Sequence, residues 1–363
     1  MRVLVVNAGS TSLKLRVVEP HDRVDVAEDL DPGDDKALSD FVARVGRLDA
    51  VGHRVVHGGP HFVQPAVVTD AVRNELEKLN ELAPLHNPPA VHAIEAVSAV
   101  LPELPVVACF DTAFHASLPE EAYRYALPTD WVERWGVRRY GFHGLSCEWA
   151  LGRAATVLDR PASDLRLAIC HLGGGASVTA VAGGRSVDTS MGFTPAEGLV
   201  MATRSGDVDP GALAWLLEQG IAPEDLSRSL EKRSGLLALS GGETSDMRVL
   251  LERRRTGDLA AAGAVAVFLH RLAAEVAAMA AASGGLDALV FTGGIGEHSA
   301  EIRAETGERL RWMGVVVDPA ANQAVGSDDL DISASGSPVA ALVIRAREEL
   351  VVADHCRRLL GTA

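Results

Sequence analysis

Two short segments, the first rich in hydroxyl residues and the second in glycine, follow apolar runs and could bind phosphate groups. Asn7 to Lys14 reads Asn-Ala-Gly-Ser-Thr-Ser-Leu-Lys and comes directly after Val3–Val6. His171 to Gly175 reads His-Leu-Gly-Gly-Gly and comes directly after Leu167–Cys170. Because small residues let backbone N–H groups approach an anion closely, both segments indicate phosphate-binding turns. For either segment taken alone, an ordinary polar hairpin turn is the competing interpretation.

Neither segment is one of the common nucleotide motifs that open a helix. The chain contains no G-x-x-x-x-G-K-[ST] sequence and no G-x-G-x-x-G at the start of a helix. A P-loop and a Rossmann site are therefore not supported. We expect phosphate-binding turns of the strand–turn–strand type instead, one in each half of the chain.

The elements that must position these turns alternate between strand and helix along the chain. Apolar runs typical of buried strands occur at Val3–Val6, Val106–Cys109, Leu167–Cys170, Leu289–Phe291 and Val339–Ile344. Helices are expected at Ala90–Val100, after Asn-Pro-Pro, and at Leu259–Ala282. The alternation predicts an α/β protein, and the repeated strand–turn–strand plan predicts a duplicated architecture.

The strand that follows the first turn shows a two-residue period. This period places Ser12, Lys14 and Arg16 on one face of the strand. Leu13, Leu15 and Val17 are expected on the buried face. The lysine and the arginine should therefore face away from the core.

Composition limits the class of protein. A length of 363 residues with 47% hydrophobic residues suits two soluble domains. The net charge of −15 argues against a nucleic acid or an anionic membrane as partner, although it leaves a small anionic substrate open. The four cysteines form no C-x-x-C pair, and the first apolar run is too short for a signal peptide. We expect a cytoplasmic protein.

Taken together with further motifs, the two turns make the chain resemble the acetate kinase family of the sugar kinase, Hsp70 and actin superfamily. The resemblance runs almost from end to end. Besides the two turns, it rests on blocks at residues 52–59, 84–88, 110–115, 139–144, 203–210, 245–248, 291–298 and 347–350.

The resemblance implies a two-domain, ribonuclease H-like fold with duplicated βββαβαβα-type cores and ATP in an interdomain cleft. The implied N-terminal domain comprises residues 1–113 plus 349–363 and carries the first phosphate hairpin and the acyl-substrate side. The implied C-terminal domain comprises residues 114–348 and carries the second hairpin and the adenosine site. A homodimer is also implied.

The same resemblance assigns the substrate, catalytic and metal residues. Arg54 is the implied carboxylate-binding residue, and Asp111, His143 and Arg204 are the implied catalytic residues. The small apolar acyl pocket is implied to contain Val56, Leu85, Phe142 and Pro195. Asn7 and Glu348 are the implied ligands of Mg²⁺, with Mn²⁺ as the alternative metal.

On the nucleotide side the resemblance implies contacts from both turns, from a turn near residue 246 and from a glycine loop near residue 295. The implied ATP- and ADP-binding residues are Ser10, Ser12, Lys14, His171, Leu172, Gly173, Gly174, Gly175, Asp246, Met247, Arg248, Gly294, Ile295, Gly296, Glu297 and His298. His53, His57, His86 and His115 stay open as ordinary satisfied histidines.

The implied reaction explains why cations dominate the list. A carboxylate is already ionised at neutral pH, so transfer of the ATP γ-phosphoryl group to acetate needs no general base. It needs fixed positive charge to bring two anions together, which Arg54, Arg204 and His143 supply. We therefore expect Asp111 to orient these groups or the water shell of the metal.

The expected function is reversible, magnesium-dependent formation of acetyl phosphate and ADP by direct in-line transfer, with propionate a weaker substrate. The alternatives are a propionate or butyrate kinase, and a nucleotide switch of the actin or Hsp70 kind without a small acceptor. Three features depart from the resembled pattern. The stretch from Lys14 to Arg54 is short, Gly174 replaces asparagine and Cys147 replaces histidine.

Overall fold

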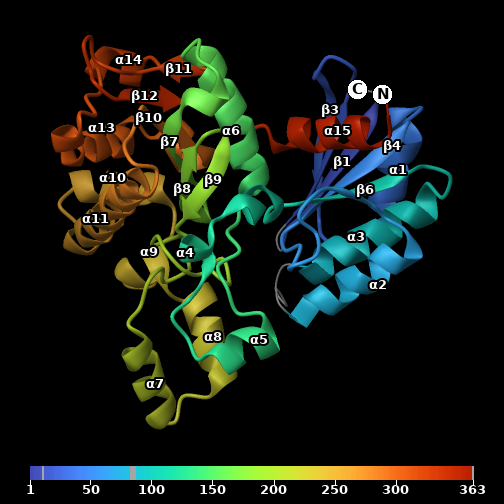
Figure 1. Ribbon diagram of the computed structural model, residues 1–363, viewed down its shortest axis with the longest axis horizontal. Coiled ribbons are helices and arrows are strands. Elements are labelled where there is room, and N and C mark those ends of the chain that lie inside the picture. Colours follow the sequence, from blue (N-terminus) through green and yellow to red (C-terminus); the bar gives the residue numbers. More distant parts are fainter. Residues whose placement is uncertain (10–11, 82–86, 362–363) are drawn as a thin grey trace. The chain divides into compact units, whose positions relative to one another are not determined.

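The computed structural model describes residues 1–9, 12–81 and 87–361 and divides into two compact units. Unit 1 comprises Met1–Ala116, Phe142–Trp149 and Arg347–Ala363. Unit 2 comprises Ser117–Gly141 and Ala150–Ala346. Figure 1 shows the elements of each unit in the colours of the sequence.

Unit 1 is built on a six-stranded sheet in the order β3-β2-β1-β4-β6-β5. The strands are β1 (Val3–Ala8), β2 (Leu13–Val18), β3 (Val24–Leu30), β4 (Ala50–Val55), β5 (Ala66–Val67) and β6 (Val106–Phe110). β1, β2 and β3 pair antiparallel, whereas β1, β4 and β6 run parallel. The carboxyl ends of β1, β4 and β6 therefore meet at one edge of the sheet.

Helices cover both faces of this sheet because β1 is apolar on both sides. Leu4 and Val6 lie in a core shared with α1 (Asp35–Val45), α2 (Asp70–Lys78) and α3 (Asn87–Val100). Val3 and Val5 lie in a second core with α15 (Glu348–Leu359). A parallel strand that is buried on both faces reads as a continuous apolar run, which is how Val3–Val6 was detected.

Unit 2 repeats the plan with a sheet in the order β11-β12-β10-β7-β8-β9. The strands are β7 (Arg166–Leu172), β8 (Ala176–Ala182), β9 (Arg185–Thr189), β10 (Ala288–Thr292), β11 (Leu330–Asp331) and β12 (Ala340–Val343). β7, β8 and β9 pair antiparallel, and β7, β10 and β12 run parallel. The two sheets thus share one strand order and one set of directions, which confirms the predicted α/β fold with duplicated cores.

The remaining helices belong mainly to unit 2. They are α4 (Glu120–Tyr123), α5 (Thr129–Trp135), α6 (Gly144–Val157), α7 (Pro210–Glu218), α8 (Pro223–Lys232), α9 (Gly235–Leu239), α10 (Met247–Arg255), α11 (Leu259–Ala282), α12 (Gly293–His298), α13 (Ala300–Arg309) and α14 (Pro319–Gln323). Short 3₁₀ turns lie at Leu79–Glu81, Ala113–Ser117, Ala162–Asp164 and Arg311–Met313.

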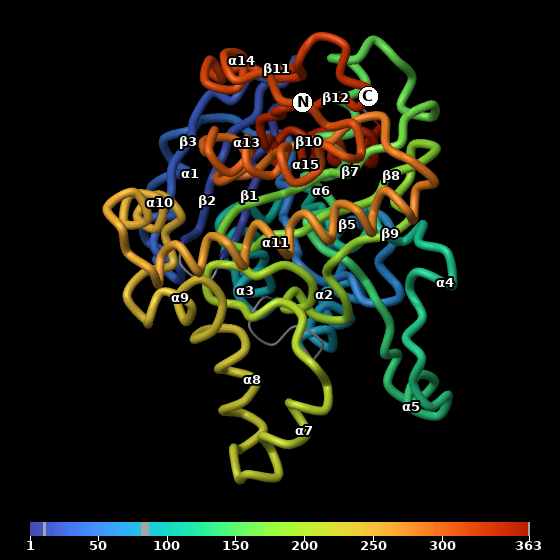
Figure 2. Tube along the Cα trace, turned by 90° about the vertical axis from the view of Figure 1, so that its left-hand side faces the viewer, coloured from blue at the N-terminus to red at the C-terminus, as the bar shows by residue number. Residues whose placement is uncertain are grey.

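The long helix α11 confirms the prediction of a helix over Leu259–Ala282. It lies across β7, β8 and β9 and buries Phe268, Leu272 and Val276 (Figure 2). Within the described ranges it alone has the length and hydropathy that could span a membrane, and 44% of its most apolar window is buried inside the protein. It is placed as a core helix of unit 2.

Three segments lie in a different unit from the one we expected. Residues 114–116, 142–149 and 347–348 were expected in the C-terminal domain, but all three lie in unit 1. The backbone N–H of Gly144 donates to the carbonyl of Asp111 at 2.9 Å, and Leu145 packs in the core with α15. These contacts hold the start of α6 against unit 1.

Candidate active site

Three polar residues of unit 1 meet where β1, β4 and β6 end. Asn7 and Arg54 are register partners on the parallel strands β1 and β4, and Asp111 directly follows β6. Arg54 Nη1 donates to Asn7 Oδ1 at 3.1 Å, and Arg54 Nη2 forms an ion pair with Asp111 Oδ2. Open α/β sheets bind ligands at such carboxyl edges. The structure thus brings together three residues that the sequence places far apart.

A second carboxylate completes the surroundings of the Arg54 guanidinium. Glu348, the first residue of α15, lies with Oε2 3.7 Å from Arg54 Nε. The Asp111 side chain is only 1% exposed, whereas that of Arg54 is 17% exposed. Burial opposes the charge of Arg54, but the Asp111 and Glu348 carboxylates outweigh it and raise the pKa of the guanidinium. Arg54 is therefore a permanent, pre-oriented cation.

His143 stands in a backbone conformation that few side chains adopt. Its φ of +59° lies in the left-handed region, which few residues other than glycine adopt, although asparagine, aspartate and histidine are found there more often than other side chains. The contacts of the two adjacent residues, Phe142 and Gly144, show how this backbone conformation of His143 is maintained. The Phe142 carbonyl lies 2.9 Å from His115 Nε2, and a Cβ on Gly144 would collide with the carbonyl of Asp111. Such strain persists where the surroundings fix it, and it is frequent at functional sites.

The buried histidines of unit 1 support the backbone of this site. Burial lowers the pKa of His53 to about 3, and it lowers that of His115 to about 4 against the opposing effect of the Phe142 carbonyl. His57 Nδ1 accepts from the N–H of Gly59 at 2.9 Å. At neutral pH His53 and His115 are therefore uncharged. The interactions of His57 and His115 match ordinary satisfied histidines, whereas the buried Nε2 of His53 has no hydrogen-bond partner among the residues that the structure describes.

Each of the two predicted phosphate turns is closed by a glycine N–H that donates to a carbonyl further along the chain. In the first, the N–H of Gly9 donates to the carbonyl of Ser12 at 2.9 Å. In the second, the N–H of Gly173 donates to the carbonyl of Gly175 at 2.9 Å. Lys14 is exposed and stands opposite Asn7 in the β1–β2 ladder, as the two-residue period predicted. Both strand–turn–strand predictions are confirmed as structures.

A cavity of about 850 Å³ in unit 2 adjoins the second turn. Its volume falls in the range of about 300–1,000 Å³ that small-molecule sites have. Eight of its lining residues were predicted on the nucleotide side: Gly173, Gly174, Asp246, Met247, Arg248, Gly294, Ile295 and His298. Ser245, which belongs to the predicted nucleotide block at residues 245–248, also lines the cavity. Seven further lining residues had no predicted ligand contact: Ala202, Leu251, Arg255, Ser299, Ala300, Glu301 and Gln323.

The second turn and the loop that carries Arg204 are joined at this cavity. The N–H of Ala202 donates to the carbonyl of Gly174 at 3.1 Å, and the N–H of Met201 donates to the carbonyl of Arg204 at 3.1 Å. Arg204 Nη1 also reaches the carbonyl of Pro195 at 3.3 Å. Arg204 and Pro195, predicted from separate motifs, are thus neighbours. In the sequence, Arg204 follows two residues after Ala202, which lines the cavity.

Some residues that were predicted to bind the nucleotide do not line the cavity. Leu172 is buried in the strand β7. Glu297 uses its carboxylate within unit 2, because Oε1 accepts from the N–H groups of Gly293 and Ala346 and Oε2 pairs with Arg345. His171, Gly175 and Gly296 are also not part of the cavity lining. Ser10 and Leu85 lie outside the described residues.

Comparison with known proteins places the whole chain in one family. A model described as the acetokinase family matches residues 35–354. An acetate kinase of Deinococcus radiodurans is 46% identical, with 99% of this chain and 98% of that protein covered. An acetate kinase of Pseudarthrobacter chlorophenolicus is 43% identical over 100% of both.

Solved structures agree with the sequence comparisons. A crystal structure of an acetate kinase from Porphyromonas gingivalis superposes with a TM-score of 0.91 at 36% identity, covering 99% of both chains. A propionate kinase from Francisella tularensis superposes with a TM-score of 0.90 at 35% identity, covering 98% of both chains. On this sequence match, which spans the described sites of both units, the chain belongs to the acetokinase family.

Proposed function

We propose that this protein transfers the γ-phosphoryl group of ATP to acetate, reversibly giving acetyl phosphate and ADP. One observation carries the proposal: the Arg54 guanidinium is held by Asp111 and Glu348 yet remains partly exposed. A guanidinium offers two parallel donors that match the two oxygens of a carboxylate. The names of the relatives and of the superposed acetate kinase support the choice of acetate.

Asp111 is a positioning residue in this proposal and not a base. Its carboxylate is nearly inaccessible and already pairs with Arg54. Acetate brings no proton that must be removed at neutral pH. Asp111 therefore holds Arg54 in the orientation that receives the substrate.

Arg204 and His143 stabilise the charge of the transferring phosphoryl group. This group passes through a loose transition state whose charge is spread over three equatorial oxygens, and fixed donors lower its energy. The contacts of Arg204 with Pro195 and of its loop with Gly174 support a place beside the phosphates. The strained backbone of His143 supports a role that depends on the exact direction of its side chain.

The nucleotide binds in the cavity of unit 2, with its phosphates at Gly173 and Gly174. The backbone of these glycines lets an anion approach closely, since no side chain intervenes. The walls formed by α10 and α13 then receive the base. A nucleotide fits the volume of the cavity.

Oxygen donors in unit 1 fit the divalent ion that such a reaction uses. Asn7 Oδ1 and the Glu348 carboxylate both lie beside the Arg54 guanidinium. Magnesium usually takes a few oxygen ligands of this kind from the protein and completes its coordination with waters. These two residues would hold the ion. When bound, magnesium neutralises charge on the β- and γ-phosphates.

Acetate is the preferred substrate and propionate a weaker one. Val56 and Phe142 of unit 1 belong to the apolar acyl pocket in this proposal, and Pro195 of unit 2 stays a prediction. One extra methylene changes binding by only about 1–3 kcal/mol in an apolar pocket, so discrimination is modest. The high similarity to a propionate kinase structure agrees with this expectation. The protein is expected to act as a cytoplasmic homodimer.

Trapping of the acyl phosphate with hydroxylamine tests the proposal. Wild type is incubated with ATP, magnesium and acetate, propionate or butyrate, and hydroxamate is measured. We expect hydroxamate with acetate, less with propionate, and a loss of at least about 100-fold in Arg204→Ala because fixed donors of this kind contribute roughly that much. If ATP is bound or hydrolysed while no hydroxamate forms, a nucleotide switch becomes the better explanation.

A further inference from the structure

A run of three arginines at the end of α10 meets a group of carboxylates beside the nucleotide cavity. In a chain of net charge −15, Arg253-Arg254-Arg255 is a conspicuous basic run. Arg253 pairs with Glu243 and Asp258. Arg254 and Arg255 both pair with Glu301, the second residue of α13. The basic run is thus neutralised within unit 2.

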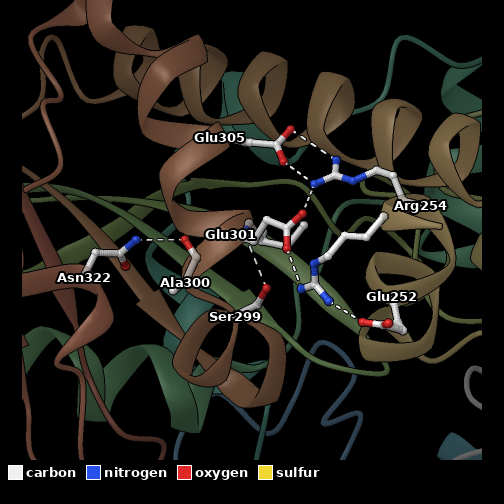
Figure 3. A network of polar contacts seen from close by, with 9 residues as sticks. Glu252, Arg254, Ser299, Ala300, Glu301, Glu305 and Asn322 are labelled. Carbon is white, nitrogen blue, oxygen red and sulfur yellow. Dashed lines mark hydrogen bonds and ion pairs between the residues drawn. The ribbon is translucent and has the colours of Figure 1, made fainter. Parts of the chain in front are cut away.

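Glu301 is the centre of this network. Its Oε1 pairs with Arg254 and its Oε2 lies 2.8 Å from Arg255 Nη2. Arg254 also reaches Glu305 at 2.5 Å, and Arg255 reaches Glu252 at 2.6 Å. Figure 3 shows Glu301 and Glu305 of α13 facing Arg254 of α10. Burial opposes the charge of Glu301, but the two arginines outweigh it and lower its pKa.

The two helices joined by Glu301 also form the wall of the cavity. Arg248, Leu251 and Arg255 share one face of α10, at helical spacing, and all three line the cavity. Glu301 lines it from α13. The network therefore fixes the distance between two parts of the wall.

The start of α13 is itself firmly held, so the network acts on a fixed element. Ser299 Oγ caps the helix by accepting from the N–H of Ile302 at 3.3 Å. Asn322 Nδ2 donates to the carbonyl of Ala300 at 2.8 Å, and Figure 3 shows both contacts. The buried side chain of Arg303 binds the carbonyls of Gly296 and Glu297, each at 2.9 Å.

Charge identifies which end of the nucleotide meets this wall. Glu252, Glu301 and Glu305 outnumber Arg254 and Arg255, so the network carries one net negative charge. The negative end of the α10 dipole and the positive end of the α13 dipole meet at this wall and oppose each other, so the net charge of the side chains decides. This net negative charge disfavours phosphates, for which the backbone N–H of Gly174 is the donor in the second turn, because that of Gly173 already donates to the carbonyl of Gly175. The uncharged base belongs at the α10–α13 wall.

We propose that Glu301 is a positioning residue for the nucleotide base, acting by holding Arg254 and Arg255 of α10 against α13. The inference rests on the proposed function, because it takes the cavity as the ATP site. Glu301 holds the planar Arg255 guanidinium at the wall, where a guanidinium can lie against the face of a purine.

The test compares Glu301→Gln with Glu308→Gln. Glu308 lies on the same helix and pairs with Arg311 at 2.7 Å, but both side chains are more than 60% exposed. We expect Glu301→Gln to raise the KM for ATP and the Kd for ADP about 3- to 10-fold, the effect of losing two partly exposed ion pairs. Glu308→Gln should leave both within about twofold.

Three further readouts separate positioning of the base from general stability. Three quantities should stay within about twofold of the wild-type values in Glu301→Gln: kcat, the KM for acetate and the inhibition constant of inorganic tripolyphosphate. Tripolyphosphate is the probe because it has phosphates but no base. Arg255→Gln should weaken ADP binding in the same direction. If Glu301→Gln lowers only the free energy of unfolding, or weakens the binding of tripolyphosphate as much as the binding of ADP, the inference is wrong.

Hydrogen exchange on the wild type distinguishes the inference from the proposal on which it rests. ADP should slow amide exchange in residues 245–255 and 293–301. If it does not, the nucleotide binds elsewhere, and both the site assignment and the inference are wrong. If exchange is slowed but Glu301→Gln binds ADP as tightly as the wild type, only the inference is wrong.

Discussion

The Arg54–Asp111 pair can be tested by replacing Asp111 with asparagine, which keeps the volume of the side chain and removes its charge. Asp111 is 1% exposed and Arg54 17% exposed, so the change leaves a largely desolvated guanidinium without its nearest counter-charge. Removal of one partner from a buried pair costs about 3–5 kcal/mol. Since Arg54 keeps Glu348 at 3.7 Å and Asn7 at 3.1 Å, we expect the lower end, about 3 kcal/mol.

Two assays measure the consequences of Asp111→Asn. Urea unfolding gives the loss of stability, and steady-state hydroxamate formation gives the catalytic effect. A misplaced Arg54 should raise the KM for acetate at least about tenfold, equivalent to about 1.4 kcal/mol of lost carboxylate binding, without changing the Kd for ADP.

Asp29→Asn is the matched control for Asp111→Asn. It removes a carboxylate that pairs with Arg16 at 2.7 Å on the same sheet but is 50% exposed, and it should cost under about 1 kcal/mol. Equal stability of Asp111→Asn and wild type, together with an unchanged KM for acetate, would show that Asp111 does not position Arg54.

Three further predictions concern single features of the structure. A Cβ on Gly174 meets no atom within 4 Å, so Gly174→Asn should fold as the wild type does. Its amide should lower the KM for ATP about two- to tenfold through one added hydrogen bond, and a raised KM would contradict this. Burial, and then the Asp207 carboxylate, raises the pKa of Glu275 to about 7. The folded chain therefore keeps this proton to a higher pH than the unfolded chain, and stability falls as pH rises from about 4.5 to about 7. Glu275→Gln removes that loss and should gain about 1–2 kcal/mol over wild type across this window in unfolding titrations, a figure reduced for partial exposure; a difference independent of pH would refute it. All four cysteines are buried, so the native protein should resist a thiol reagent that labels all four after unfolding; rapid labelling of the native protein would contradict this.

Much of the fold could be predicted because its main signals are local. Val3–Val6 and Leu167–Cys170 are buried on both faces, so each gives an uninterrupted apolar run. The turns after them are closed by glycine N–H groups, and glycine is the local signal that revealed them. The long apolar helix α11 was equally visible.

The site was harder to predict because its contacts span long distances in the sequence. Arg54 is 57 residues from Asp111, and no periodicity links either of them to Glu348. The left-handed backbone of His143 depends on Gly144 fitting against Asp111, which needs the folded structure. Glu301 was not predicted, because the basic run Arg253-Arg254-Arg255 is a local signal but its partner carboxylate lies 46–47 residues further along the chain.

Transfer of an oxygen label from acetate to phosphorus tests phosphoryl transfer to the carboxylate most directly. The protein is incubated with ATP, magnesium and ¹⁸O-labelled acetate, and the products are followed by ³¹P NMR. Direct attack by the carboxylate predicts acetyl phosphate whose phosphorus signal is shifted by a bridging ¹⁸O. Free phosphate that carries oxygen from water, with no labelled acetyl phosphate, would contradict the proposed function.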